Sequence, residues 1–145
     1  GTPMRAPLEG IRVVDTTDGR GELCGRLLAD LGADVILVEP PEGSALRRTG
    51  PFDPSGEHSL AHAWRNANKR GIVADLTTAA GLDRLGALLA EADVWVESST
   101  PGVGVDPAPI AAAHPHLVVT HLPKRLQSKI ILVLILHLDH CLVFS

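Results

Sequence analysis

The chain has 145 residues, of which 45% are hydrophobic and 21% are charged, and its formal net charge is −4 at pH 7. This length and composition predict one globular domain with a real core and exclude an intrinsically disordered chain. Basic residues are scattered along a chain that is acidic overall, which argues against nucleic acid as the main partner.

Short apolar runs alternate along the chain with amphipathic stretches. Residues 35–39 (Val-Ile-Leu-Val-Glu) are almost wholly apolar, which indicates a strand covered on both faces. Strands that alternate with helices predict a Rossmann-like, doubly wound α/β fold with a mainly parallel sheet and helices on both faces. The predicted strands are residues 11–15, 35–39, 71–75, 94–97 and 117–120.

Capping signals delimit three predicted helices. Leucines on one face mark residues 23–31, and Gly32 is a typical residue to end that helix. A threonine cap at 77 or 78 precedes an apolar face over residues 82–89, and Asp106-Pro107 begins a short helix through residue 113. Residues 40–56 are rich in Pro, Gly and Arg and predict a surface loop after the second strand.

Composition changes from Lys124 onward, because the last glycine is Gly104 and the last alanine is Ala113. We therefore expect residues 4–123 to form the domain and residues 124–145 to be a tail of different origin. An ordinary last strand or helix is the alternative for that tail. Residues 1–3 resemble the remainder of an expression tag, so we do not expect them to belong to the fold.

The turn after the first strand, residues 19–25 (Gly-Arg-Gly-Glu-Leu-Cys-Gly), resembles a dinucleotide-binding loop but departs from it. Cys24 stands where the third glycine belongs, and Gly25 comes one residue late. Asp18 and Glu22 flank the turn and would repel a diphosphate, so Glu22 is better interpreted as a first-turn acid that stabilises the helix. An NAD-binding oxidoreductase is thus the least favoured function.

Cys24 and Cys141 are too few for a disulfide framework, and we expect a cytoplasmic protein. The longest apolar run is too short to span a membrane, so no membrane partner is expected. Residues 137–141 (His-Leu-Asp-His-Cys) lack an evident fourth ligand, and no metal site is predicted. Cys24 is interpreted as a buried apolar residue, and Trp64 and Trp95 as core or interface residues.

Further motifs lie in residues 7–15, 24–41, 66–76 and 92–103, followed by His114-Pro-His-Leu-Val. In order and spacing they resemble the class III coenzyme A transferases, the group of formyl-CoA transferase, carnitine-CoA transferase and α-methylacyl-CoA racemase. The resemblance extends from Pro7 to Thr120. It implies the amino-terminal, CoA-binding part of an interlocked homodimer whose substrates are coenzyme A or acyl-CoA and a carboxylic acid.

The resemblance also implies which residues contact coenzyme A, at the carboxyl ends of the strands, where an open α/β sheet binds its ligands. Lysine and arginine would offer charge to the phosphates, and asparagine would offer hydrogen bonds. The implied contact residues are Glu39, Pro40, Asn66, Asn68, Lys69, Arg70, Glu97, Ser98, Pro101 and Gly102.

Each of these roles has a plainer alternative. Lys69 and Arg70 could form a solvated turn before the third strand, and the two strand-end glutamates could simply be exposed. Arg47 and Arg48 could contact a phosphate, and exposure to solvent without such a contact is an equal alternative.

The family's nucleophilic aspartate lies beyond the point at which the resemblance ends, and Asp139 has no matching context, so no catalytic residue is assigned. The first turn lacks the family's Gly-Pro step, which puts acyl contacts near Arg20 in question. The sequence predicts a truncated class III CoA-transferase-like protein. Its intact form would transfer CoA between carboxylic acids or racemise an acyl-CoA, and this chain would bind CoA at most. The alternative is a non-catalytic fragment for dimerisation or partner binding.

Overall fold

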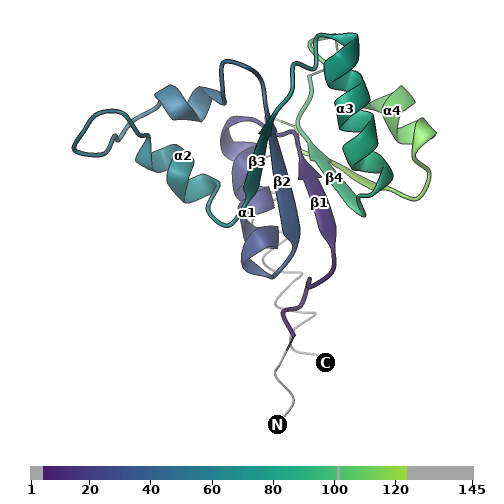
Figure 1. Cartoon of the computed structure of the whole chain (residues 1–145), viewed down its shortest axis with the longest axis horizontal. Coiled ribbons are helices and arrows are strands. Elements are labelled where there is room, and N and C mark those ends of the chain that lie inside the picture. Colours follow the sequence, from purple (N-terminus) through teal and green to yellow (C-terminus); the bar gives the residue numbers. More distant parts are fainter. Residues whose placement is uncertain (1–4, 101, 124–145) are drawn as a thin grey trace.

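The computed structural model describes residues 5–100 and 102–123, with only the backbone of Arg20. In this part of the chain, five parallel strands form one sheet in the order β3-β2-β1-β4-β5 (Figure 1). This confirms the predicted doubly wound α/β fold. The strands are β1 (Arg12–Asp15), β2 (Asp34–Glu39), β3 (Arg70–Val73), β4 (Val94–Glu97) and β5 (Val118–His121).

Helices cover both faces of the sheet (Figure 1). The predicted capping signals are used: Gly32 has φ 101°, the Thr78 hydroxyl accepts from the Gly81 amide, and Asp106 accepts from the Ala108 amide. The α-helices are α1 (Glu22–Asp30), α2 (Leu60–Arg65), α3 (Ala79–Ala90) and α4 (Pro107–Ala113), and the 3-10 helices are η1 (Gly19–Gly21) and η2 (Ala45–Arg48).

The sheet divides the core into two layers. Val35 packs in the layer that contains Cys24 of α1, whereas Val38 packs in the layer that contains Leu85 and Leu89 of α3. Successive residues of β2 therefore face opposite layers, which explains its nearly continuous apolar sequence. Trp95 of β4 lies in the α3 layer and is buried, as expected of a core residue.

The strand order reverses at β1: β2 and β3 lie on one side of it, and β4 and β5 lie on the other. From β1 the chain moves outward through α1 to β2 and then to β3, and it returns through α3 to β4 on the other side of β1. A doubly wound sheet opens a crevice at such a point, beyond the carboxyl ends of the two strands. The topology thus places the turn after β1 beside the loop after β4.

Residues 40–66, which we call the excursion, connect β2 to β3 and project beside the β3 edge of the sheet (Figure 1). The sequence predicts a loop over residues 40–56, but the structure has η2 inside it, with Leu46 buried, and α2 after it was not predicted. Helix α2 has only six residues, which is too short for the repeated apolar pattern by which a helix is recognised in sequence. None of the described helices is long and apolar enough to cross a membrane.

Candidate functional site

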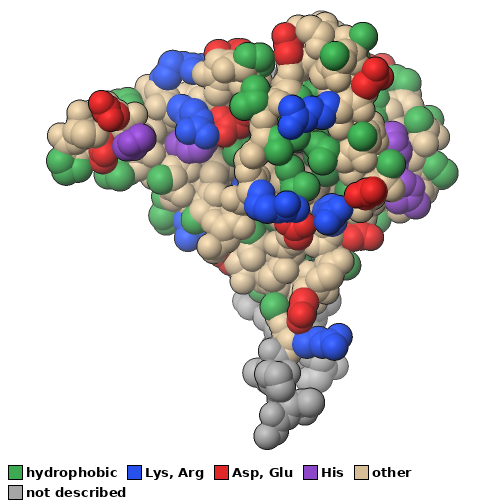
Figure 2. Space-filling view, in the orientation of Figure 1, with side chains coloured by type: hydrophobic (Ala, Val, Ile, Leu, Met, Phe, Trp, Pro, Cys, Tyr) green, Lys and Arg blue, Asp and Glu red, His purple; other side chains and the backbone are tan. Residues whose placement is uncertain are grey.

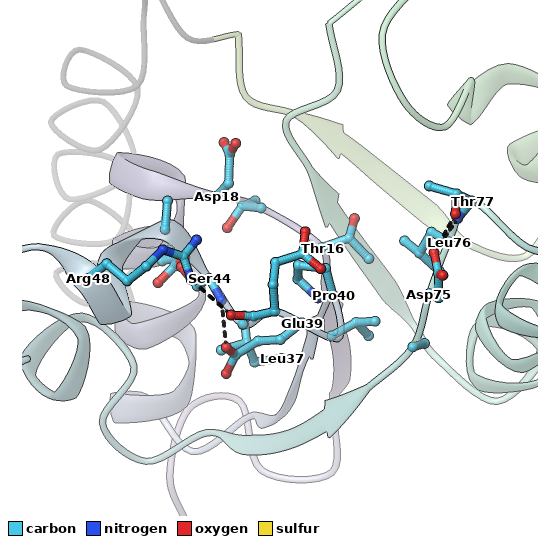
Figure 3. Close-up of a pocket in the computed structure, with 17 residues that line it drawn as sticks. Thr16, Asp18, Leu37, Glu39, Pro40, Ser44, Arg48, Asp75, Leu76 and Thr77 are labelled. Atoms are coloured by element: carbon cyan, nitrogen blue, oxygen red, sulfur yellow. Dashed lines mark hydrogen bonds between the residues drawn. The ribbon is translucent and has the colours of Figure 1, made fainter. Parts of the chain in front are cut away.

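A cavity of about 580 Å³ opens at the carboxyl ends of β1, β2 and β3 (Figure 3). Thr16 follows β1, Pro40 follows β2, and Asp75 to Thr77 follow β3 on the opposite wall. A second cavity of about 290 Å³ lies at the crevice between β1 and β4, and it shares Thr16, Asp18 and Leu76 with the first. A third, of about 480 Å³, continues along the loop after β4 to His121. Together they form the strand-end site.

Lys69 forms a buried ion pair beneath this site. Its ammonium donates to Asp15 at 2.7 Å, to the Glu22 carbonyl at 2.6 Å and to the Asn66 side-chain oxygen at 2.8 Å. The side chain is 1% exposed, which excludes the solvated-turn interpretation for Lys69. Since an ammonium has three N–H groups, all its donors are engaged within the fold.

Glu39 ends β2 as a buried carboxylate rather than an exposed strand end. Arg47 donates to both of its oxygens at 2.7 Å, and the Ser44 amide donates to it at 2.8 Å. The hydrogen bond from Arg47 is the main reason that the pKa of Glu39 falls to about 2, and the amide adds to it. His62 lies near the same carboxylate, with 3.6 Å between its Nε2 and Glu39 Oε1.

Glu22 connects α1 to both ends of the excursion. It is fully buried and accepts hydrogen bonds from the Ser44 hydroxyl and from the Asn66 side-chain amide. Ser44 caps η2 and Asn66 ends α2, so one carboxylate positions both of these helices. The sequence interpretation of Glu22 as a helix-stabilising acid did not include these long-range contacts.

The loop after β4 is organised by Glu97 and Ser98. Glu97 is buried and accepts from the Ser99 amide at 2.8 Å, from the Ser99 hydroxyl at 2.6 Å and from His121. The Ser98 hydroxyl accepts from the Asp18 amide at 3.1 Å and thereby joins the turn after β1 to the loop after β4. These contacts hold both walls of the crevice in place.

The structure does not bring all the predicted contact residues to one place. Glu39 and Pro40 line the first cavity, Glu97 and Ser98 line the second, and Gly102 lines the third. Asn66, which is partly buried, and the buried side chain of Lys69 line none of the three cavities and bond to Glu22 and Asp15 instead, and Pro101 lies outside the described residues. Whether any of these residues contacts a ligand stays a prediction.

Asn68 and Arg70 lie at the opposite, amino-terminal edge of the sheet. Arg70 donates to both oxygens of Asp34, at the start of β2, at 2.8 and 2.6 Å, and this pairing lowers the pKa of Asp34. Asn68 donates to Asp30, at the end of α1, at 2.7 Å. The cause is topological: the residues that precede a strand lie at its amino end, whereas only the long side chain of Lys69 reaches the end of β1.

Sequence reasoning missed the hydroxyl residues that line the site. Thr16, Ser44 and Thr77 each follow a strand and each line the first cavity. The sequence could have indicated these residues, because each belongs to a polar segment directly after a β-branched or apolar run.

Cys24 is buried, as predicted, and burial raises the pKa of its thiol to about 11, so the thiolate is disfavoured. Among the described residues no group of three His, Cys, Asp or Glu side chains could hold a metal ion. The histidines and cysteine of residues 137–141 lie outside them.

Comparison with known proteins shows the family of the chain. The sequence model of CoA-transferase family III matches residues 8–124. The chain is 37% identical over 123 residues to a probable fatty acyl-CoA transferase of Mycobacterium tuberculosis, covering 80% of this chain and 31% of the relative. It is 40% identical over 101 residues to the formyl-CoA:oxalate CoA-transferase of Afipia carboxidovorans, covering 69% and 24%.

The fold is shared as well. The crystal structure of a CAIB/BAIF family protein from Brucella suis superposes with a TM-score of 0.72 at 37% identity, covering 81% of this chain and 33% of that one. The chain thus spans between about a quarter and a third of the length of these relatives. Since the family match covers most of its residues, the chain belongs to CoA-transferase family III.

Proposed function

We propose that this chain is the amino-terminal, acyl-CoA-binding part of a CoA-transferase that moves CoA between carboxylic acids. The observation that carries the proposal is the strand-end site, which lies inside the segment that matches the family. An open α/β sheet binds its ligands at this position because loops from several strands converge there. Racemisation of an acyl-CoA is the alternative reaction for the whole protein.

The lining suits a flexible ligand with amides and methylene groups. Thr16, Thr77 and Ser98 offer hydroxyls, and Leu76 and Val103 offer apolar surface. Glu39 shapes the wall rather than reacting, because a carboxyl with a pKa of about 2 stays ionised at neutral pH and cannot donate a proton.

We do not assign a catalytic nucleophile. The family resemblance implies an aspartate after the matched segment. The buried carboxylates of the described residues are engaged: Asp15 by Lys69, Glu39 by Arg47, Glu22 by two hydrogen bonds, and Glu97 by Ser99 and His121. We therefore expect the 145-residue chain to bind acyl-CoA without transferring it.

Titration calorimetry with CoA and succinyl-CoA tests binding. Val103 is 68% exposed and lines two cavities, so a Val103→Trp side chain would fill the site without disturbing the core. We expect this variant to bind at least about tenfold more weakly, a loss of about 1.4 kcal/mol. The control is Val118→Trp on β5, where the valine is 60% exposed and outside these cavities. No binding at millimolar ligand, or equal weakening by both variants, would refute the site.

Transfer assays with oxalate, succinate and carnitine as acceptors test the expectation that this chain does not transfer CoA. Turnover by this chain alone would contradict the expected absence of a nucleophile and would require a search for one.

A partner-binding role is a second candidate. Its supporting observation is a set of exposed apolar side chains on the excursion, Phe52, Leu60 and Trp64, which are 43%, 47% and 57% exposed. The homodimer implied by the family and the cytoplasmic setting also remain proposals. Light scattering of the chain and of a Leu60→Gln variant would detect an assembly, because loss of an interface residue lowers the measured mass.

A further inference from the structure

Among the side chains that the structure describes, which do not include that of Arg20, the lining of the strand-end site is poor in positive charge. In the linings of its three cavities, Arg48 is the one Lys or Arg side chain among those that the structure describes. Coenzyme A carries a diphosphate and a 3′-phosphate, and proteins hold such groups with arginine, lysine or free backbone amides. On the face shown in Figure 2, basic and acidic side chains are interspersed rather than gathered into a basic patch.

The neighbouring cations are committed to carboxylates of the fold. Lys69 is buried against Asp15, and Arg70 is paired with Asp34 at the far edge of the sheet. Arg47 binds Glu39 through two hydrogen bonds, which together with the charge of Glu22 raise its pKa. To bind the Arg47 guanidinium, a phosphate would have to displace Glu39, which accepts two hydrogen bonds from it at 2.7 Å.

Carboxylates dominate the lining itself. Five of them line the largest cavity, and one of these, Glu22, stands in the first turn of α1, where the helix terminus would otherwise favour a ligand anion. Phosphates in this cavity would be repelled by nearby charges of the same sign. The five residues are Asp18, Glu22, Glu39, Glu42 and Asp75.

Seven backbone amides in the segments after β1 to β4 are engaged by the chain's own side chains. In each case a carboxylate or hydroxyl oxygen accepts the amide hydrogen bond, so a phosphate oxygen would have to compete for that amide. The pairs, amide first, are Thr17–Asp15, Asp18–Ser98, Ser44–Glu39, Leu46–Ser44, Thr77–Asp75, Gly81–Thr78 and Ser99–Glu97.

We propose that the strand-end site binds the uncharged pantetheine thioester arm of its substrate and disfavours the phosphorylated nucleotide. This inference rests on the proposed function and names the part of the acyl-CoA that this chain holds. Tight binding of whole CoA then requires positive charge from outside the described residues. The hydroxyl of Thr16 and the apolar side chain of Val103 match the amides and methylene groups of that arm.

The test compares acetyl-pantetheine, acetyl-dephospho-CoA and acetyl-CoA by titration calorimetry of the whole chain at low and high salt. We expect the affinity to rise, or at least not fall, as phosphates are removed. Salt should strengthen acetyl-CoA binding several-fold, because it screens repulsion between ligand and site, and should leave acetyl-pantetheine binding unchanged.

A charge variant sharpens the comparison. Glu42 lines the largest cavity with an exposed side chain, so Glu42→Arg adds a cation there without disturbing the core. It should raise the ratio of acetyl-CoA affinity to acetyl-pantetheine affinity by about fivefold or more, because only the former ligand is charged. Glu57→Arg, on the exposed part of the excursion and outside the cavities, is the matched control and should leave this ratio unchanged.

The outcomes separate the two proposals. If none of the three ligands binds, the proposed function fails and this inference fails with it. If acetyl-CoA binds more tightly than acetyl-pantetheine and weakens as salt is added, the site supplies positive charge and this inference alone is overturned.

Discussion

The ammonium of Lys69 lies 2.7 Å from the carboxylate of Asp15, and both side chains are at most 1% exposed. The pair joins the residue before β3 to the last residue of β1, 54 positions apart in the chain. Because a buried charge is tolerated only with a partner, the pair ties the entry of β3 to the floor of the strand-end site.

Removing one member of this pair should be far more harmful than removing both. We expect Lys69→Met to lower the free energy of unfolding by about 3–5 kcal/mol, since it leaves the Asp15 carboxylate buried without its cation. The double variant Asp15→Asn, Lys69→Met should recover part of that loss. Urea denaturation measures the free energy of unfolding of both variants, and Arg5→Gln, at an exposed residue, is the control. A double variant less stable than the single one would contradict this account.

The Glu39–Arg47 pair predicts a pH dependence of stability. The pKa of Glu39 is about 2 in the folded protein and near its ordinary value of 4.5 when unfolded, so the unfolded chain takes up the proton first as pH falls. The stabilisation is complete above about pH 4.5 and is lost between pH 4.5 and 2. Arg47→Met should remove most of it, about 1–2 kcal/mol, because half of Arg47 is exposed and water screens the pair.

Urea denaturation at a series of pH values between 6 and 2 would measure this slope. Arg48→Met is the control, since its guanidinium donates to the carbonyl of Glu42 rather than to a carboxylate, and it should keep the slope. An Arg47→Met variant with the original slope would show that the pair is not its source.

Gly25 in α1 should tolerate no side chain. A Cβ atom there would lie 2.1 Å from the Asp15 carboxylate and 3.0 Å from the Lys69 side chain. Gly25→Ala should therefore lower the melting temperature, although the same change in an open helix position gains about 1 kcal/mol. Gly86 in α3 is such a position, with no atom within 4 Å of its Cβ site, and Gly86→Ala should raise the melting temperature. Equal shifts in the two variants would be inconsistent with the crowding at Gly25.

Ser44 should control the order of the excursion. Its hydroxyl donates to Glu22 and accepts from the Leu46 amide, so Ser44→Ala removes a cap and leaves one contact of a buried carboxylate unmade. We expect faster hydrogen exchange at amides 44–66, by about tenfold, with little change in β1 and β2. Ser55→Ala is the matched control, because that hydroxyl bonds only within the exposed turn near Asp53. Unchanged exchange in Ser44→Ala would mean that Glu22 does not anchor the excursion through this serine.

Local sequence signals were sufficient for most of the fold. The near-continuous apolar run of β2, the leucine stripes of α1 and α3, and the caps at Gly32, Thr78 and Asp106 each depend on neighbouring residues, so pattern alone predicts them. Helix α2 escaped prediction because its six residues are too few to show a periodic apolar pattern.

For the site, too, the sequence predicted some features and not others. The chain order placed Glu39 and Glu97 at strand ends, since any residue that ends a buried parallel strand lies at the carboxyl edge. Glu39 pairs with Arg47 only eight residues away, whereas other partners are distant in the chain: His121 is 24 residues from Glu97, and Lys69 is 54 residues from Asp15. The family resemblance implied that Lys69 contacts the ligand, whereas the structure buries its side chain against Asp15, because a buried charge needs a counter-charge.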